Sequence, residues 1–104
     1  MAPSSYVASP VSTENNTLTP IGIAAMLGNL EVVQVLVHAG ANINTAHIPE
    51  NAAPLHFSVF ANHQSVTQFL LDSGADKKTV DKHGQTALDV AQLEGHNEIV
   101  SMLS

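Results

Sequence analysis

Apolar residues in this chain recur at spacings that predict short amphipathic helices. From Val32 to Leu36 they stand at positions i, i+1, i+3 and i+4, which places them on one face of a helix. Apolar residues return at matching positions in Val66–Leu70 and Ile99–Leu103. A second apolar pattern precedes each of these stretches, so the sequence predicts a succession of helix pairs.

The helix pairs recur as an internal repeat. Three units, residues 14–47, 48–80 and 81–104, begin 34 and 33 residues apart and align position by position. Helices this short are not stable alone, because nucleation costs more free energy than two turns return. They are expected to persist by stacking on copies of themselves, which predicts an all-α solenoid of helix-turn-helix units.

Residues at the expected helix ends support this division. Thr19 can accept a free N–H of the first turn as N-cap, and Pro20 suits the first helical position, where no donor is needed. The second unit has Ala53 in place of the threonine, so its first helix is expected to start less firmly. First helices are expected to end near Gly28, Asn62 and Gly95, and second helices at Gly40 and Gly74. The polar segments between units are expected to project as β-turn or hairpin fingers.

Residues 1–13 differ from the rest, because they are rich in Ser, Pro and Ala and show no helical period. They are expected to form a flexible N-terminal tail, which leaves residues 14–104 as one repeat domain. Ser9 precedes Pro10, so it is a candidate for proline-directed phosphorylation.

Composition and charge narrow the classes of partner. The formal net charge is −6, and the only cations are three lysines, too few to displace the counterions of a nucleic acid. The absence of cysteine excludes disulfides and cysteine-based metal sites and is compatible with an intracellular location, cytoplasmic or nuclear. No apolar stretch is long enough to span a membrane, so a membrane partner is not expected.

The units also share a motif. The third unit shows it with Asp81, Gly84, Thr86, Leu88, Ala91, Gly95 and His96. With their counterparts in the other units, these residues make residues 14–104 resemble the ankyrin repeat. The resemblance implies stacked helix pairs with projecting fingers, and a concave side at which another protein binds. In the second unit Ile48 and Asn51 replace the usual Asp and Gly, so its finger is expected to be irregular.

The resemblance gives His56 a structural part. It implies that His56 hydrogen-bonds near the start of its helix and ties neighbouring loops, where a neutral ring needs one donor and one acceptor partner. His63 and His96 occupy equivalent positions of adjacent units, about 10 Å apart by ordinary helix packing, too far to share one zinc. No metal, cofactor or catalytic residues are expected, since the sequence has no nucleophile elbow or phosphate-binding loop.

Repeat register predicts which residues face a partner. At the fingers these are Asn15, Asn16, Leu18, Pro49, Glu50, Ala52, Lys82, His83 and Gln85. At the ends of the first helices they are Met26, Leu27, Phe60, Ala61, Leu93 and Glu94. Met26, Phe60 and Leu93 align as an apolar row, which we interpret as the centre of a protein-binding groove. The alternative is that the fingers partly bury this row.

The sequence thus favours a protein–protein interaction module, such as an adaptor, inhibitor or targeting subunit, without catalytic turnover. A different class of function is a structural or self-associating repeat domain, or a fragment of a larger ankyrin protein. The second helix of the first unit is almost all Val and Leu, so the tail, a second copy of the chain or an upstream repeat is expected to cover it. Asn44 resembles the finger asparagine that asparaginyl hydroxylases modify in some ankyrin proteins.

Overall fold

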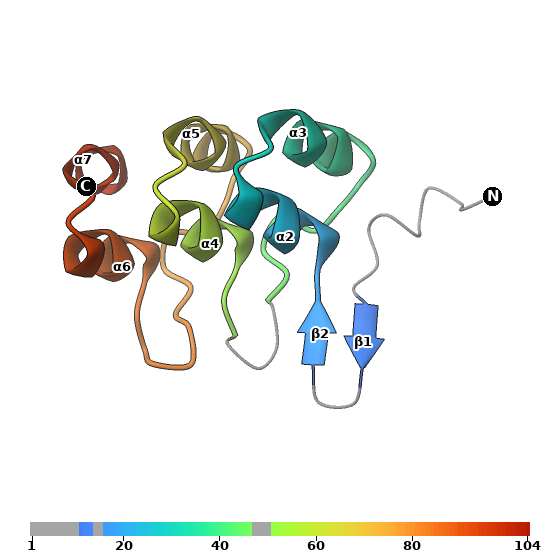
Figure 1. The fold of residues 1–104 in the computed structure, drawn as a ribbon, viewed down its shortest axis with the longest axis horizontal. Coiled ribbons are helices and arrows are strands. Elements are labelled where there is room, and N and C mark those ends of the chain that lie inside the picture. Colours follow the sequence, from blue (N-terminus) through green and yellow to red (C-terminus); the bar gives the residue numbers. More distant parts are fainter. Residues whose placement is uncertain (1–10, 14–15, 47–50) are drawn as a thin grey trace.

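The computed structural model describes residues 11–13, 16–46 and 51–104, and in it three helix pairs stand side by side in one row (Figure 1). The pairs are α2 (Pro20–Leu27) with α3 (Leu30–His38), α4 (Pro54–Phe60) with α5 (Gln64–Asp72), and α6 (Ala87–Glu94) with α7 (Asn97–Leu103). The first helices α2, α4 and α6 form one layer, and the second helices α3, α5 and α7 form the other. The expected all-α stack of helix-turn-helix units is confirmed.

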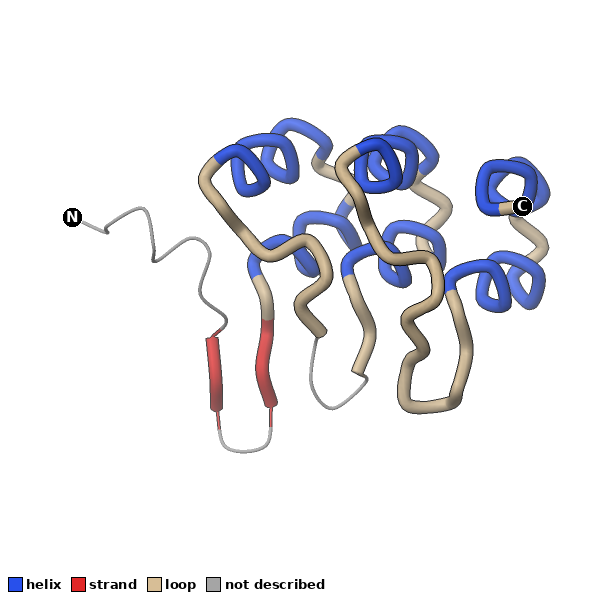
Figure 2. Tube along the Cα trace, turned by 180° about the vertical axis from the view of Figure 1, so that it is seen from behind, coloured by secondary structure: helices blue, strands red, loops and turns tan. Residues whose placement is uncertain are grey.

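Fingers project from the same side of the first-helix layer along the row (Figure 2). The first finger is a hairpin of β1 (Val11–Thr13) and β2 (Asn16–Leu18), paired antiparallel. The third finger is a loop in which the Asp81 N–H donates to the Gln85 carbonyl at 2.9 Å. The short hairpin is the only sheet in the part of the chain that the structure describes.

The hairpin corrects the boundary of the expected tail. The sequence analysis assigns residues 1–13 to the tail, but Val11–Thr13 form a strand, because their backbone groups pair with those of β2. A strand of three residues is too short to show a reliable alternation of apolar and polar side chains. Residues 1–10, Ser9 among them, lie outside the described residues.

The first helices begin in two different ways. The Thr19 hydroxyl accepts from the Gly22 N–H at 3.0 Å, and the Thr86 hydroxyl accepts from the Asp89 N–H at 3.2 Å. In the second pair Ala53 has no hydroxyl, but the Ala53 N–H donates to His56 Nδ1 at 3.2 Å. The histidine therefore satisfies a backbone donor at the start of α4, which partly compensates for the missing cap.

The first helices end where the sequence analysis places their ends. Gly28 and Gly95 adopt left-handed backbone conformations with φ of 74° and 73°, and Asn62 does the same with φ of 62°. Glycine reaches this conformation without steric cost, and asparagine is the side chain that tolerates it best. The three expected helix ends are therefore confirmed.

The apolar core lies between the two helix layers and between neighbouring pairs. Val33, Leu70 and Ile99 of the second helices are fully buried, as are Ala25 and Val59 of the first helices. Burying a side chain of this kind stabilises the fold by about 1.5–3 kcal/mol relative to exposure. Because the first helices pack against one another along the row, as do the second helices, the stack itself supplies the stability that single pairs lack.

One polar cluster interrupts the core in the middle pair. The buried hydroxyls of Ser58 and Thr67 lie 2.9 Å apart, and Thr67 also donates to the His63 carbonyl at 2.9 Å. Ser58 donates to the Leu55 carbonyl at 3.1 Å. Since each hydroxyl has partners, neither carries the cost of an unsatisfied buried polar group.

Candidate protein-binding groove

An open cleft of about 240 Å³ lies between the second and third helix pairs, walled by α4, α6 and the third finger. Seven residues expected to face a partner line it: Ala52, Phe60, Lys82, His83, Gln85, Leu93 and Glu94. Register did not select four other lining residues: His56, Phe57, Asp81 and Val90. Phe57 and Val90 stand three residues before Phe60 and Leu93, so helical spacing was the signal that could have found them.

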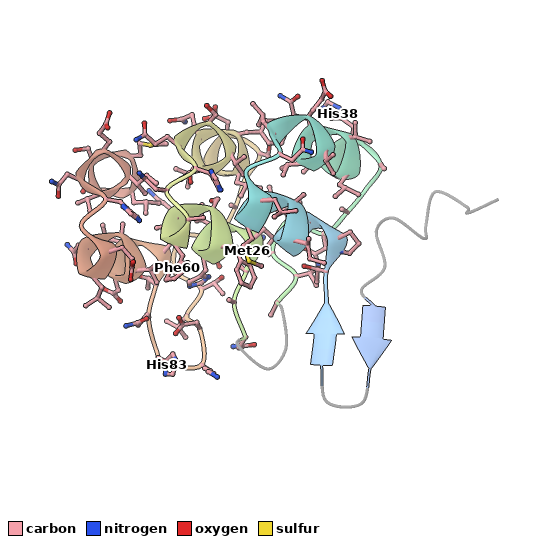
Figure 3. All side chains as sticks on the ribbon, in the orientation of Figure 1. Met26, His38, Phe60 and His83 are labelled. Atoms are coloured by element: carbon pink, nitrogen blue, oxygen red, sulfur yellow. The ribbon has the colours of Figure 1, made fainter. Side chains whose placement is uncertain are left out.

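The apolar row is open to solvent. Met26 is 41%, Phe60 57% and Leu93 68% exposed. Met26 and Phe60 lie on the finger side of their helices, and His83 lies at the tip of the third finger (Figure 3). All three side chains therefore keep a large exposed surface, although part of each is covered. Phe60 and Leu93 line the cleft, and Met26 lies beyond it.

Three further predicted contact residues differ in how much surface they offer. Leu27 is 72% exposed but lies outside the cleft, and Ala61 is half-buried. Ala52 is buried, with 6% of its surface exposed, although it borders the cleft. A small side chain that is covered offers little contact area, and a contact of Ala52 with a partner stays a prediction.

The remaining predicted residues lie in the first two fingers. Asn15, Pro49 and Glu50 fall outside the described residues. Asn16 and Leu18 belong to β2, for which the structure describes the backbone. The described part of the cleft is formed by the second and third helix pairs and the third finger.

The rim of the cleft carries charge on the third finger. The Asp81 carboxylate accepts from the His83 N–H at 2.8 Å and from the Gln85 N–H at 3.0 Å, which fixes the turn that presents Lys82 and His83. Partial burial raises the pKa of the Asp81 carboxyl. The hydrogen bonds from the Gln85 and His83 N–H groups, with a smaller effect of the His83 imidazole, together lower it more, so the pKa lies below its ordinary value of 3.8.

His56 connects α4 to the third finger. It is 4% exposed, its Nδ1 accepts from the Ala53 N–H at 3.2 Å, and its Nε2 lies 2.9 Å from the Gln85 carbonyl. This pattern requires a neutral ring with its proton on Nε2, because a carbonyl can only accept. The structural part that the resemblance implies for His56 is confirmed.

Two further histidines hold the backbone of the apolar row. His63 Nε2 lies 3.0 Å from the Met26 carbonyl, and His96 Nε2 lies 3.1 Å from the Phe60 carbonyl. Each imidazole thus donates to the preceding helix pair. The predicted separation of the two histidines did not reveal that each has a backbone carbonyl as its partner. Their matching places just before the second helices were the signal for a shared role.

Asn44 links the second and third fingers. Its side-chain oxygen accepts from the Asp76 N–H at 2.9 Å, and its own N–H donates to the Asn42 side chain at 3.0 Å. Asn44 is exposed, and its modification stays a prediction.

Among the described residues, no group of three or more His, Cys, Asp or Glu side chains converges as a metal site would require. Within the same residues, no helix has the length and apolar content needed to cross a membrane.

Two family models together match most of the chain. One, described as "Ankyrin repeats (3 copies)", matches residues 46–104, and the other, "Ankyrin repeat", matches residues 16–48. Both matches cover helix pairs and fingers that the structure shows.

Several curated proteins are similar to parts of the chain. Human ARF GTPase-activating protein GIT1 is 34% identical over 73% of this chain and 10% of its own length. Dauer abnormal formation protein 25 of Caenorhabditis elegans is 30% identical over 84% of this chain and 22% of its own length. Mouse protein phosphatase 1 regulatory subunit 12A is 36% identical over 70% of this chain and 7% of its own length. The chain spans less than a quarter of each relative, and with its matched repeats and its fold it belongs to the ankyrin-repeat family.

Proposed function

We propose that the chain is a protein-interaction module that binds one partner protein at its concave, finger-bearing side. The observation that supports this most is the apolar cleft, because Phe60 and Leu93 line it and remain more than half exposed. Covering apolar surface gains about 25 cal/mol per Å², and aromatic side chains beside a pocket are typical centres of binding energy.

The charged residues at the rim of the cleft indicate which other groups a partner would present. Lys82 and His83 project from the third finger on one side, and Glu94 ends α6 on the other. A partner segment with an apolar side chain for the cleft and a carboxylate facing Lys82 fits this arrangement. Charges of this kind govern the association rate and specificity more than the affinity.

Binding without turnover is consistent with how the titratable groups of the cleft are used. Both ring nitrogens of His56 are hydrogen-bonded to backbone groups, and the Asp81 carboxylate holds the backbone of its own finger. A general acid or base needs to reach a substrate proton. In our proposal these two groups maintain the shape of the groove.

The relatives support a regulatory setting. One is named as a regulatory subunit and another as a GTPase-activating protein, and the matched segment is a small part of each. We extend to this chain only the role of a module that brings proteins together, as adaptor, inhibitor or targeting subunit, inside the cell.

The test is to add a charge to the groove. Phe60→Glu and Leu93→Glu are each expected to lower the affinity for a partner identified by capture and mass spectrometry by about a hundredfold, with an unchanged Tm. Ser101→Glu, at an exposed position of α7, is the matched control and is expected to bind as the wild type does.

The proposal fails if both groove variants keep wild-type affinity while remaining folded. It also fails if Ser101→Glu weakens binding as strongly as they do. Affinity is measured by titration calorimetry and folding by thermal unfolding of each variant.

A further inference from the structure

The first helix pair presents an uncovered apolar face at the end of the row. We name Ile23, Val32 and Val35 the end face; they are 39%, 41% and 63% exposed. Positions aligned with Val32 are Val66 and Ile99, which are 1% and 0% exposed. Their helices α5 and α7 each pack against the second helix of the preceding pair, whereas the described part of the chain shows no helix pair beyond α3 (Figure 1). The end face therefore has the chemistry of an interface between pairs.

The opposite end of the row is closed by polar residues. Ala25 and Val59 are fully buried, but the aligned position of the third pair is the exposed Gln92. Ser104 is likewise exposed where the first pair has the partly buried Val37. Because these two positions are polar at this end, extension of the row head to tail by a second copy is less favoured than contact between two end faces.

We propose that the end face of one chain packs against the end face of a second copy, in a two-fold dimer with the two α3 helices antiparallel. The likeness to the interior of the row supports a helix-to-helix contact, since the aligned side chains of Val66 and Ile99 are buried there. An isologous interface needs only one surface that is complementary to itself. Small branched side chains meet that need.

The distribution of charge favours the same occupant. Between residues 16 and 46, Glu31 is the only Asp, Glu, Lys or Arg, so the net charge of −6 is concentrated in the rest of the chain. Two copies can therefore meet at their first pairs with little repulsion, and a shortage of charge is typical of interface centres. Antiparallel α3 helices with Val32 opposite Val35 also bring Glu31 near His38 of the second copy, twice by symmetry.

The test is the molecular mass of the full chain in solution, measured by sedimentation equilibrium over a range of concentrations. The wild type is expected to dimerise. Val35→Glu is expected to weaken dimerisation by about a hundredfold without unfolding, because Val35 is already exposed in the monomer. Leu93→Glu, an exposed apolar residue of the groove, is the matched control and is expected to dimerise as the wild type does.

A charge exchange tests the antiparallel arrangement. Glu31→Lys and His38→Glu are each expected to weaken the dimer, and the double variant is expected to restore it. A wild type that stays monomeric, a dimer unaffected by Val35→Glu, or a double variant that restores nothing each overturns the proposal. If removal of residues 1–10 turns a monomer into a dimer, the tail is the cover, and the proposal is equally overturned.

Discussion

At the scale of single residues, the third finger depends on one carboxylate and one imidazole. Asp81 holds two backbone N–H groups of its own turn, and His56 reaches the Gln85 carbonyl from α4. Between them they fix where Lys82 and His83 stand relative to Phe60. The position of the groove rim is therefore a property of two side chains that are not expected to touch the partner.

The lowered pKa of Asp81 predicts an acid-sensitive contribution to stability. Its folded pKa lies below its unfolded value of about 3.9, so the carboxylate stabilises the fold above that pH, and the contribution is lost as pH falls through the folded pKa. Asp81→Asn is expected to lower the free energy of unfolding at pH 7, and its curve should approach the wild-type curve at acidic pH. Urea unfolding between pH 7 and pH 3 measures this, and a constant gap between the two curves would contradict it.

At the scale of helices and their ends, contact between pairs depends on a glycine. A Cβ at Gly28 would lie 2.5 Å from atoms of the His63 ring, whereas a Cβ at Gly95 would meet nothing within 4 Å. Both glycines have nearly the same positive φ, 74° and 73°. The two positions therefore share a backbone requirement and differ in their neighbours.

This difference predicts unequal costs for the same substitution. Gly95→Ala is expected to lower the free energy of unfolding by about 1–2 kcal/mol through the left-handed backbone alone. Gly28→Ala is expected to cost more, because it also displaces His63 from the Met26 carbonyl. Denaturant unfolding of the two variants separates the cost of the left-handed backbone from the cost of displacing His63. Equal losses would show that the contact with His63 contributes nothing.

The helix ends also show what local sequence can predict. Thr19, Pro20 and Gly28 act within a few residues of their own position, so their roles follow from the sequence. The partners of His63 and His96 are 37 and 36 residues away in the sequence, and a histidine alone does not reveal which carbonyl it will meet. The role of His56 follows from the resemblance to the ankyrin repeat. The contacts of His63 and His96 do not follow from it.

At the scale of the whole molecule, the row is built from contacts between neighbours. α4 contacts both α2 and α6, and α5 contacts both α3 and α7. Stability in such an array is approximately a sum over pairs and their interfaces. The middle pair takes part in two interfaces and the third pair in one. A destabilising substitution in the middle pair is therefore expected to affect more of the molecule than one in the third pair.

Leu70 and Leu103 occupy aligned positions in α5 and α7, 0% and 5% exposed, and allow a matched test. Either leucine-to-alanine change is expected to cost about 2–5 kcal/mol in the region it destabilises. Leu70→Ala should reduce amide-exchange protection in all three pairs, since it weakens both interfaces. Leu103→Ala should reduce protection mainly in α6 and α7. Uniform loss of protection in Leu103→Ala would contradict this.

The shape of the cleft could not be predicted from the sequence. Repeat register placed Phe60 and Leu93 side by side along one face, but the cleft between them depends on how far the third finger stands from α4. That distance is fixed by the contacts of His56 and Asp81 with Gln85. Ala52 shows the same limit, because its burial depends on covering segments that register does not describe.

The hydrogen bond between His96 Nε2 and the Phe60 carbonyl ties the third helix pair to the end of α4, which borders the cleft. A large side chain that pushed α4 and α6 apart would have to stretch this bond. Under the proposed function we therefore expect affinity to fall once the inserted side chain of a partner exceeds the size of the cleft.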